Sequence, residues 1–145
     1  MDRRIKGKTL FALWALAVLA APLLAACGGA AYRDGEWSGL SGPDDTGARG
    51  EITLTIEGGR VSGCVFITRQ KDGVVKAEDY GKVNGEIANA DFYEKAQLAV
   101  RAMGRYAEQY AETGRLDGVD SISGATIAYN QFMEAAEAAL KAARR

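Results

Sequence analysis

The chain has 145 residues, enough for one modest domain, and its 18 Lys and Arg residues almost balance its 19 Asp and Glu residues. It contains no histidine, which excludes Ser–His and Cys–His catalysis, histidine-bound zinc and histidine-ligated haem. Its two cysteines are too few for an iron–sulfur cluster, so any redox chemistry has to come from an organic cofactor.

The first 26 residues combine a basic start, an apolar run and small residues that precede a cysteine. This order is typical of a secretory signal peptide, and the apolar run is shorter than the ~20 residues that span a membrane. The Leu-Ala-Ala-Cys sequence ending at Cys27 resembles a bacterial lipobox. The resemblance implies cleavage before Cys27, a diacylglycerol group on the Cys27 sulfur, and palmitate-type acyl chains that anchor the protein. An ordinary signal peptide over residues 1–26 with an incidental cysteine is the alternative.

Residues 27–33 are predicted to be a lipidated tether, in which the six residues after Cys27 reach at most ~20 Å. We therefore expect the domain over residues 34–145 to lie at the extracytoplasmic face of a bacterial cell membrane. Removing residues 1–26 takes away 4 of the 18 basic and 1 of the 19 acidic residues, which leaves a formal charge of −4. That charge argues against a nucleic-acid partner. Cys64 lies in a strand pattern and is expected to be a small buried hydrophobe, not a nucleophile.

Two alternating segments predict a β-hairpin. The aliphatic residues of the segment 51–57 fall on one face, as in a half-buried strand. Gly58 and Gly59 permit the positive φ angles of a two-residue turn, and residues 60–69 form the expected return strand. Its predicted inward face holds Val61, Val65 and Ile67.

Less regular segments flank this hairpin. The residues around Trp37 are turn-like and lead into a candidate edge strand, whereas residues 40–50 predict a loop rich in Gly, Asp, Ser and Pro. Asp44 and Asp45 in that loop lack EF-hand spacing and are expected to be solvated. After the hairpin, residues 74–75 predict a short third strand and residues 76–90 a polar connector.

Two helices are expected in the second half of the chain. Asp91 and Glu94 predict a capping box, and the first helix should end at Thr113 with Gly114 as its C-cap. Its apolar stripe is Phe92, Ala96, Ala99, Met103, Tyr106 and Tyr110. The last helix is expected over residues 125–142, with an apolar face of Phe132, Ala136, Ala139, Leu140 and Ala143. Strands followed by helices predict an α+β fold, a small antiparallel sheet with two helices packed on one face.

The segment Asp120-Ser121-Ile122-Ser123-Gly124-Ala125-Thr126 joins the two helix patterns. It places the Thr126 hydroxyl at or near a helix N-terminus, where free backbone N–H groups and the helix dipole favour an anion such as phosphate. A motif of this kind is a hypothesis that structural context has to confirm. The alternative is a plain turn in which Asp120 or Ser123 caps the last helix.

This D-x-x-S-G-A-T segment resembles the FMN-binding domain family. That family includes the covalent-flavin subunits of sodium-pumping quinone reductase and of a related ferredoxin-linked membrane complex. The chain looks most similar to the small flavin lipoproteins of extracellular electron transfer, because residues 78–81, 92–97 and 129–132 also fit that branch. It lacks the Glu-Thr segment that precedes the helices in the larger quinone-reductase subunits.

The resemblance implies that a flavin transferase, using FAD and magnesium, attaches FMN through a phosphoester to Thr126. Asp120, Ser123, Gly124 and Ala125 would then be the recognition signal. The phosphodiester keeps one negative charge, which the N–H groups around residues 124–127 are placed to hold.

Thr126, Tyr129 and Asn130 share a helical face. We expect Tyr129 or Tyr80 to stack on the isoalloxazine and Asn130 to hydrogen-bond its edge. No residue offers acid–base catalysis beyond exposed carboxylates, so we predict no catalytic residue and no bound metal. The expected function is an electron carrier between a membrane quinone-linked donor and an extracytoplasmic acceptor, not a stand-alone enzyme. The alternatives are a lipoprotein surface module that binds flavin loosely or not at all, and a reductase with its own substrate.

Overall fold

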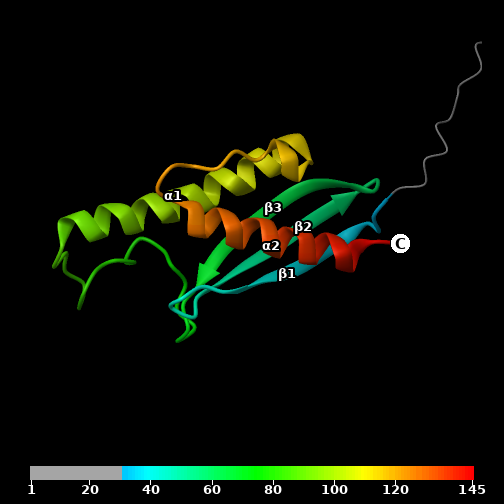
Figure 1. The fold of residues 1–145 in the computed structure, drawn as a ribbon. Helices are drawn as coiled ribbons and strands as arrows, with labels where there is room; N and C mark the ends of the chain where they lie inside the picture. Colours follow the sequence, from blue (N-terminus) through cyan, green and yellow to red (C-terminus); the bar gives the residue numbers. More distant parts are fainter. Residues whose placement is uncertain (1–30) are drawn as a thin grey trace, which may run out of the picture.

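The structure is a computed structural model that describes residues 31–145. The signal peptide predicted for residues 1–26 and the lipidation predicted at Cys27 lie outside the described residues. Three strands come first, followed by two long helices and a short 3-10 turn between them (Figure 1). The predicted α+β fold is confirmed.

The central strand β2 (Arg49–Glu57) carries the alternation read from the sequence, because Ile52, Leu54 and Ile56 are all buried. It pairs antiparallel with β3 (Arg60–Arg69). The turn between them is the predicted one, and both of its glycines have positive φ, 59° at Gly58 and 74° at Gly59. Local sequence therefore specifies this hairpin.

The predicted inward face of β3 is wrong beyond Val61. Ile56 pairs with Val61 whereas Thr55 pairs with Gly63, so one extra residue is inserted as a β-bulge. Past the bulge the faces exchange: Phe66 and Thr68 are buried, and Val65 is 63% exposed. A one-residue shift moves every later side chain to the other face of a strand.

Strand β1 (Gly35–Pro43) pairs antiparallel with β2 on the side away from β3. It runs further than its composition indicated, so the loop expected over residues 40–50 is reduced to residues 44–48. Gly39 explains the glycine-rich strand: a Cβ there would lie 2.0 Å from the Ala135 carbonyl oxygen. The third strand expected at residues 74–75 is only an isolated bridge between Arg69 and Val75.

Helices α1 (Ala90–Thr113) and α2 (Thr126–Ala143) lie on the same face of the sheet, α2 over β1 and β2 and α1 beside β3 (Figure 1). The predicted capping box is wrong, because Asn89 is the N-cap of α1 and its side chain accepts from the Phe92 N–H at 2.9 Å. The predicted end of α1 is confirmed at Gly114, with φ 64°. The 3-10 turn η1 (Leu116–Gly118) opens the link to α2.

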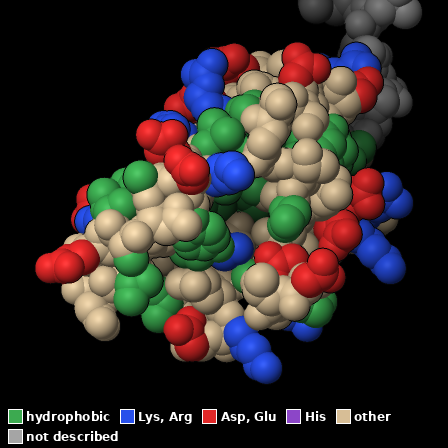
Figure 2. Space-filling model, turned by 60° about the vertical axis from the view of Figure 1, so that its left-hand side comes forward, with side chains coloured by type: hydrophobic (Ala, Val, Ile, Leu, Met, Phe, Trp, Pro, Cys, Tyr) green, Lys and Arg blue, Asp and Glu red, His purple; other side chains and the backbone are tan. Residues whose placement is uncertain are grey.

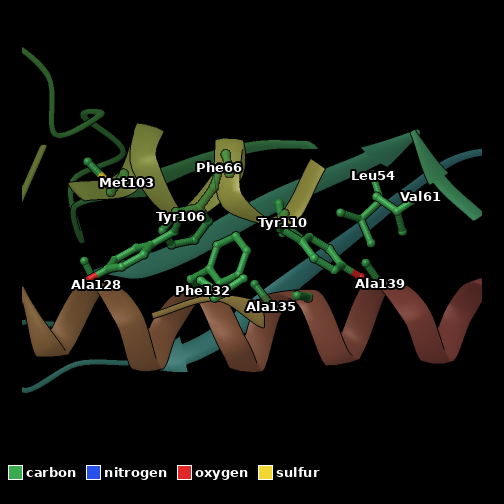
Figure 3. Packing of buried hydrophobic residues seen from close by; sticks show 14 of the residues in the cluster. Leu54, Val61, Phe66, Met103, Tyr106, Tyr110, Ala128, Phe132, Ala135 and Ala139 are labelled. Atoms are coloured by element: carbon green, nitrogen blue, oxygen red, sulfur yellow. The ribbon is translucent and has the colours of Figure 1, made fainter. Parts of the chain in front are cut away.

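The core lies between the helices and the sheet (Figure 3). Tyr106 and Tyr110 reach from α1 to either side of Phe132, with ring centroids 5.9 and 5.8 Å from it. Alanines on the facing side of α2 let the helix approach the sheet closely. Phe92, expected in the apolar stripe of α1, is instead 53% exposed.

The two ends of the described chain meet at the C-terminal end of α2 (Figure 1). The Arg33 N–H donates to the Ala143 carbonyl at 2.8 Å, and Tyr32 pairs with Arg144. An 18-residue helix is about 27 Å long, so Thr126 lies at the opposite end of α2 from the two chain ends. Within residues 31–145, neither helix combines the length and apolar character needed to cross a bilayer.

Candidate functional site

The segment between η1 and α2 is held in place by side chains of α1. The buried Tyr106 hydroxyl donates to the Ala125 carbonyl at 3.3 Å and accepts from the Ile122 N–H at 3.1 Å. One helical turn further on, Gln109 Oε1 accepts from the Asp120 N–H at 2.7 Å. Burial raises the pKa of Tyr106, which keeps its hydroxyl protonated and able to donate. The signal segment, residues 120–126, therefore has a fixed backbone. Asp120, Ser121, Ser123 and Thr126 are exposed, whereas Ile122 and Ala125 face the core.

A tight turn then delivers Thr126 to the start of α2. The Ala125 N–H donates to the Ile122 carbonyl at 3.0 Å, and Gly124 has φ +83°, a conformation that favours glycine. Ala125 occupies the N-cap position, so the first N–H groups of α2 receive no side-chain cap. Neither Asp120 nor Ser123 caps the helix, so the capping residue of the plain-turn alternative is wrong. The free N–H groups at this uncapped helix N-terminus favour an anion such as phosphate.

A cavity of about 360 Å³ opens beside this helix start, between α1, α2 and the connector that follows β3. Figure 2 shows a hollow on this side of the molecule, bordered by hydrophobic and basic side chains. The exposed Thr126 lies at the cavity with Gly124 and Ala125. The apolar residues that line the cavity are Phe92, Ala96, Ala99, Met103, Ile127 and Ala128.

A polar network closes one side of the cavity. The buried Gln131 donates from Nε2 to the Ala48 carbonyl at 2.9 Å and to Asp44 Oδ2 at 3.4 Å. Its Oε1 accepts from the Thr68 hydroxyl at 3.3 Å. Strand β3, helix α2 and the 44–48 loop thus meet at one set of hydrogen bonds, which fixes their relative positions.

Asp44 carries the negative charge of this network. Its Oδ1 accepts from the Thr46 hydroxyl at 2.6 Å and from the Ala48 N–H at 2.9 Å, and its Oδ2 lies 3.6 Å from Lys76 Nζ. Burial acts to raise the pKa of Asp44, but these hydrogen bonds and the Lys76 charge outweigh it and hold the pKa below its ordinary value. The solvated Asp44 expected from the sequence is therefore wrong, since only 10% of its side chain is exposed.

The structure separates the residues that the sequence placed at the site. Gly124, Ala125, Thr126 and Tyr80 line the cavity. Tyr129 packs on Tyr106, with ring centroids 5.6 Å apart, and does not line it. Asn130 lines a smaller neighbouring hollow with Ile127 and Glu134. Asp120 and Ser123 are exposed beside the turn and outside the cavity lining.

The sequence did not predict six polar residues of the cavity lining, Asp44, Thr46, Thr68, Lys76, Lys95 and Gln131. They come from the 44–48 loop, β3, the connector, α1 and α2, and they come together only when the helices pack on the sheet. The buried polar Gln131 on an otherwise alanine-rich helix face is the one signal that pointed to such a network.

Cys64 lies on β3 and does not line the cavity. Cys64 is partly buried, and burial raises the pKa of its thiol to about 12, so it is not a thiolate nucleophile at neutral pH. Residues 31–145 hold no cluster of His, Cys, Asp or Glu side chains arranged to bind a metal.

A model of the FMN-binding domain family matches residues 47–141, a range that includes β2, β3, both helices and most of the cavity lining, and that begins after β1, Asp44 and Thr46. The chain belongs to the FMN-binding domain family. This match confirms the resemblance read from the signal segment, and it supports FMN as the cofactor and a flavin-dependent electron-transfer role.

The fold of this FMN-binding domain has a counterpart among solved structures. The crystal structure of the CPE2226 protein from Clostridium perfringens superposes with a TM-score of 0.60 at 20% identity, over 77% of this chain and 88% of that one. At this identity the likeness establishes a shared fold alone. No curated protein matches the chain significantly.

The residues of this FMN-binding domain fit the cofactor that the family implies. A volume of about 360 Å³ falls in the range of about 300–1,000 Å³ typical of small-molecule sites. The apolar lining suits a flat aromatic ring, and the polar network offers donors and acceptors for its heteroatoms. The uncapped start of α2, beside the Thr126 hydroxyl, suits the phosphate.

Proposed function

We propose that this chain is a membrane-anchored, extracytoplasmic electron carrier whose FMN is joined by a phosphoester to the Thr126 hydroxyl oxygen. A flavin transferase forms the bond between Thr126 Oγ1 and the FMN phosphorus of FAD. The FAD pyrophosphate bond breaks, AMP leaves and the threonine proton is released. The flavin then accepts electrons from a membrane quinone-linked donor and passes them to an extracytoplasmic acceptor.

The observation that carries this proposal is the position of Thr126. Its exposed side chain opens α2 at the edge of an apolar cavity, where the helix has no side-chain cap. A phosphate diester on this oxygen would lie at the positive end of the helix dipole, an interaction worth about 0.3–1 kcal/mol. The ring attached to that phosphate has the cavity beside it.

The placement of the chain ends supports anchoring at the end of α2 that is remote from Thr126. Arg33 and Tyr32 are fixed by hydrogen bonds and bridge pairing to the C-terminal end of α2, about 27 Å from Thr126. A lipid on Cys27 would therefore hold the domain with its cavity directed away from the membrane surface, accessible to an external acceptor.

In-gel fluorescence tests the attachment. The full chain is co-expressed with a flavin transferase, denatured and separated on a gel. Wild type should give a fluorescent band, Thr126→Ser should keep it, and Thr126→Val should lose it. Thr55→Val removes a threonine hydroxyl from β2, on the side of the sheet away from the helices, and is the matched control that should remain fluorescent.

Fluorescence that persists in Thr126→Val would refute the attachment site. A wild-type chain that stays dark with an active transferase would favour the alternative, a surface module that binds flavin loosely or not at all. A carrier should also reduce and reoxidise with external partners without turning over a small-molecule substrate by itself.

A further inference from the structure

We propose that Lys76 raises the reduction potential of the flavin, by placing its ammonium group at the heteroatom edge of the isoalloxazine where negative charge collects on reduction. This inference rests on the proposed flavin site and names the residue that tunes it. Asp44, the partner of Lys76, is assigned the opposite effect.

The structure holds Lys76 firmly at the cavity. Its backbone N–H donates to the Thr68 carbonyl at 2.8 Å, which fixes the connector to the end of β3. Only 12% of its side chain is exposed. The ammonium nitrogen lies 4.9 Å from the centroid of the Tyr80 ring, and both residues line the cavity.

The Lys76 ammonium has unused hydrogen-bonding capacity. An ammonium group has three donors, yet within residues 31–145 the nearest carboxylate oxygen, on Asp44, is 3.6 Å away and beyond hydrogen-bond distance. Asp44 itself is satisfied by Thr46, Ala48 and Gln131. No buried side-chain nitrogen or oxygen of residues 31–145 lacks a partner, so solvent still reaches the Lys76 ammonium. A ligand acceptor beside it would take the place of that water at the free donors.

The polarity of the cavity orients the ring. Asp44, Lys76 and Gln131 contribute polar groups from the 44–48 loop, the connector and α2, whereas α1 contributes Met103, Ala96 and Ala99, with Lys95 as its one charged lining residue. Phe92 and Ile127, 53% and 62% exposed, are the large apolar residues of the lining that reach solvent. An isoalloxazine has a polar pyrimidine edge and an apolar dimethylbenzene edge, so the pyrimidine edge belongs beside Lys76.

The electrostatic consequence follows from the charge of the reduced ring. Two electrons from the quinone-linked donor and one proton from solvent, taken up at N5, leave one negative charge shared by N1 and the C2 carbonyl. A cation at this edge stabilises the reduced ring more than the neutral oxidised ring, which raises the potential. Asp44 repels the same charge and lowers the potential.

Potentiometric titration of the flavin-loaded chain tests the assignment, with absorbance followed while a chemical reductant is added. Lys76→Gln should disfavour reduction at least tenfold, a fall of about 30 mV for a two-electron couple. Lys76→Arg keeps the charge and should remain near wild type. Asp44→Asn should shift the potential upward. Lys82→Gln is the control. Lys82 is a cation of the same connector, but it pairs with Asp79 and does not line the cavity, so its loss should leave the potential unchanged.

The pH dependence of the potential gives a second readout. Wild type should take up one proton for two electrons near neutral pH, because Lys76 keeps the reduced ring anionic. Lys76→Gln should move this ratio toward two protons, since a neutral reduced ring becomes favourable. A merely structural role for Lys76 would not change the proton count.

The outcomes separate this inference from the proposed function. A loaded Lys76→Gln chain with unchanged potential and proton count overturns the role of Lys76 and leaves the carrier intact. An equal fall in Lys95→Gln, a second cation of the cavity lining, would show a general field effect and also overturn it. If wild type takes up no flavin, either covalently or when free FMN is added, both proposals fail together.

Discussion

The Tyr106 hydroxyl donates to the Ala125 carbonyl at 3.3 Å, and this contact joins the middle of α1 to the N-cap residue of α2. The same oxygen accepts from the Ile122 N–H at 3.1 Å, so one fully buried hydroxyl spans the signal segment. Stability and recognition by a transferase should therefore be linked through this side chain.

Tyr106→Phe should lower the free energy of unfolding by about 1–3 kcal/mol, because the Ile122 N–H loses its partner in a partly buried site. Tyr110→Phe is the matched control: Tyr110 is equally buried, but its hydroxyl makes no hydrogen bond within residues 31–145, and its loss should cost little. Urea denaturation of the flavin-free chain measures both. Equal losses of unfolding free energy in the two variants would contradict a stabilising role for the Tyr106 hydroxyl.

A second pair of variants tests how closely α2 lies on β1. Gly39→Ala should prevent folding or cost more than about 3 kcal/mol, because its Cβ would lie 2.0 Å from the Ala135 carbonyl oxygen and 2.6 Å from the Ala139 nitrogen. The same change at Gly104 of α1 meets no atom within 4 Å and should stabilise by about 0.5–1 kcal/mol. Circular dichroism melts compare them, and a tolerant Gly39 would refute this packing.

Acid should destabilise the domain through Asp44. Its pKa is lower in the folded chain than its ordinary value of 3.8, so its stabilising contribution is full above that value and is lost as the pH falls through the folded pKa. Glu51 beside Arg69 acts in the same direction, since the hydrogen bond from Arg69 lowers its pKa.

Urea midpoints measured from pH 6 down to pH 3 test this sign. Wild type should lose stability below about pH 4, whereas Asp44→Asn should begin less stable and lose less over the same interval. Curves that stay parallel for the two chains would show that Asp44 does not contribute to the acid dependence.

The sequence predicted the parts of the fold that depend on neighbouring residues. The alternation in β2, the turn at Gly58 and Gly59 and the end of α1 at Gly114 are each decided within a few positions, and all are confirmed. The inward face of β3 was wrong because a bulge next to Val61 shifts its register, and no local pattern marks an inserted residue. Strand β1 was predicted too short because the Gly, Ser and Pro residues at positions 41–43 are typical of a loop, although they complete a strand whose Gly39 lies against α2.

In the candidate site too, residues close in sequence were predicted and residues brought together by tertiary packing were not. The signal segment is contiguous, so its motif located Gly124, Ala125 and Thr126, and the structure places them at a cavity. Asp44, Lys76 and Gln131 are distant in sequence and were not predicted. Their meeting depends on how α2 and the connector pack on the sheet, which only the assembled fold reveals.

The intact mass of the chain, co-expressed with an active flavin transferase, tests the central claim most directly. The account predicts an increase equal to one FMN less one water in wild type and Thr126→Ser, and no increase in Thr126→Val. An unmodified wild-type mass, or the same increase in Thr126→Val, would contradict it.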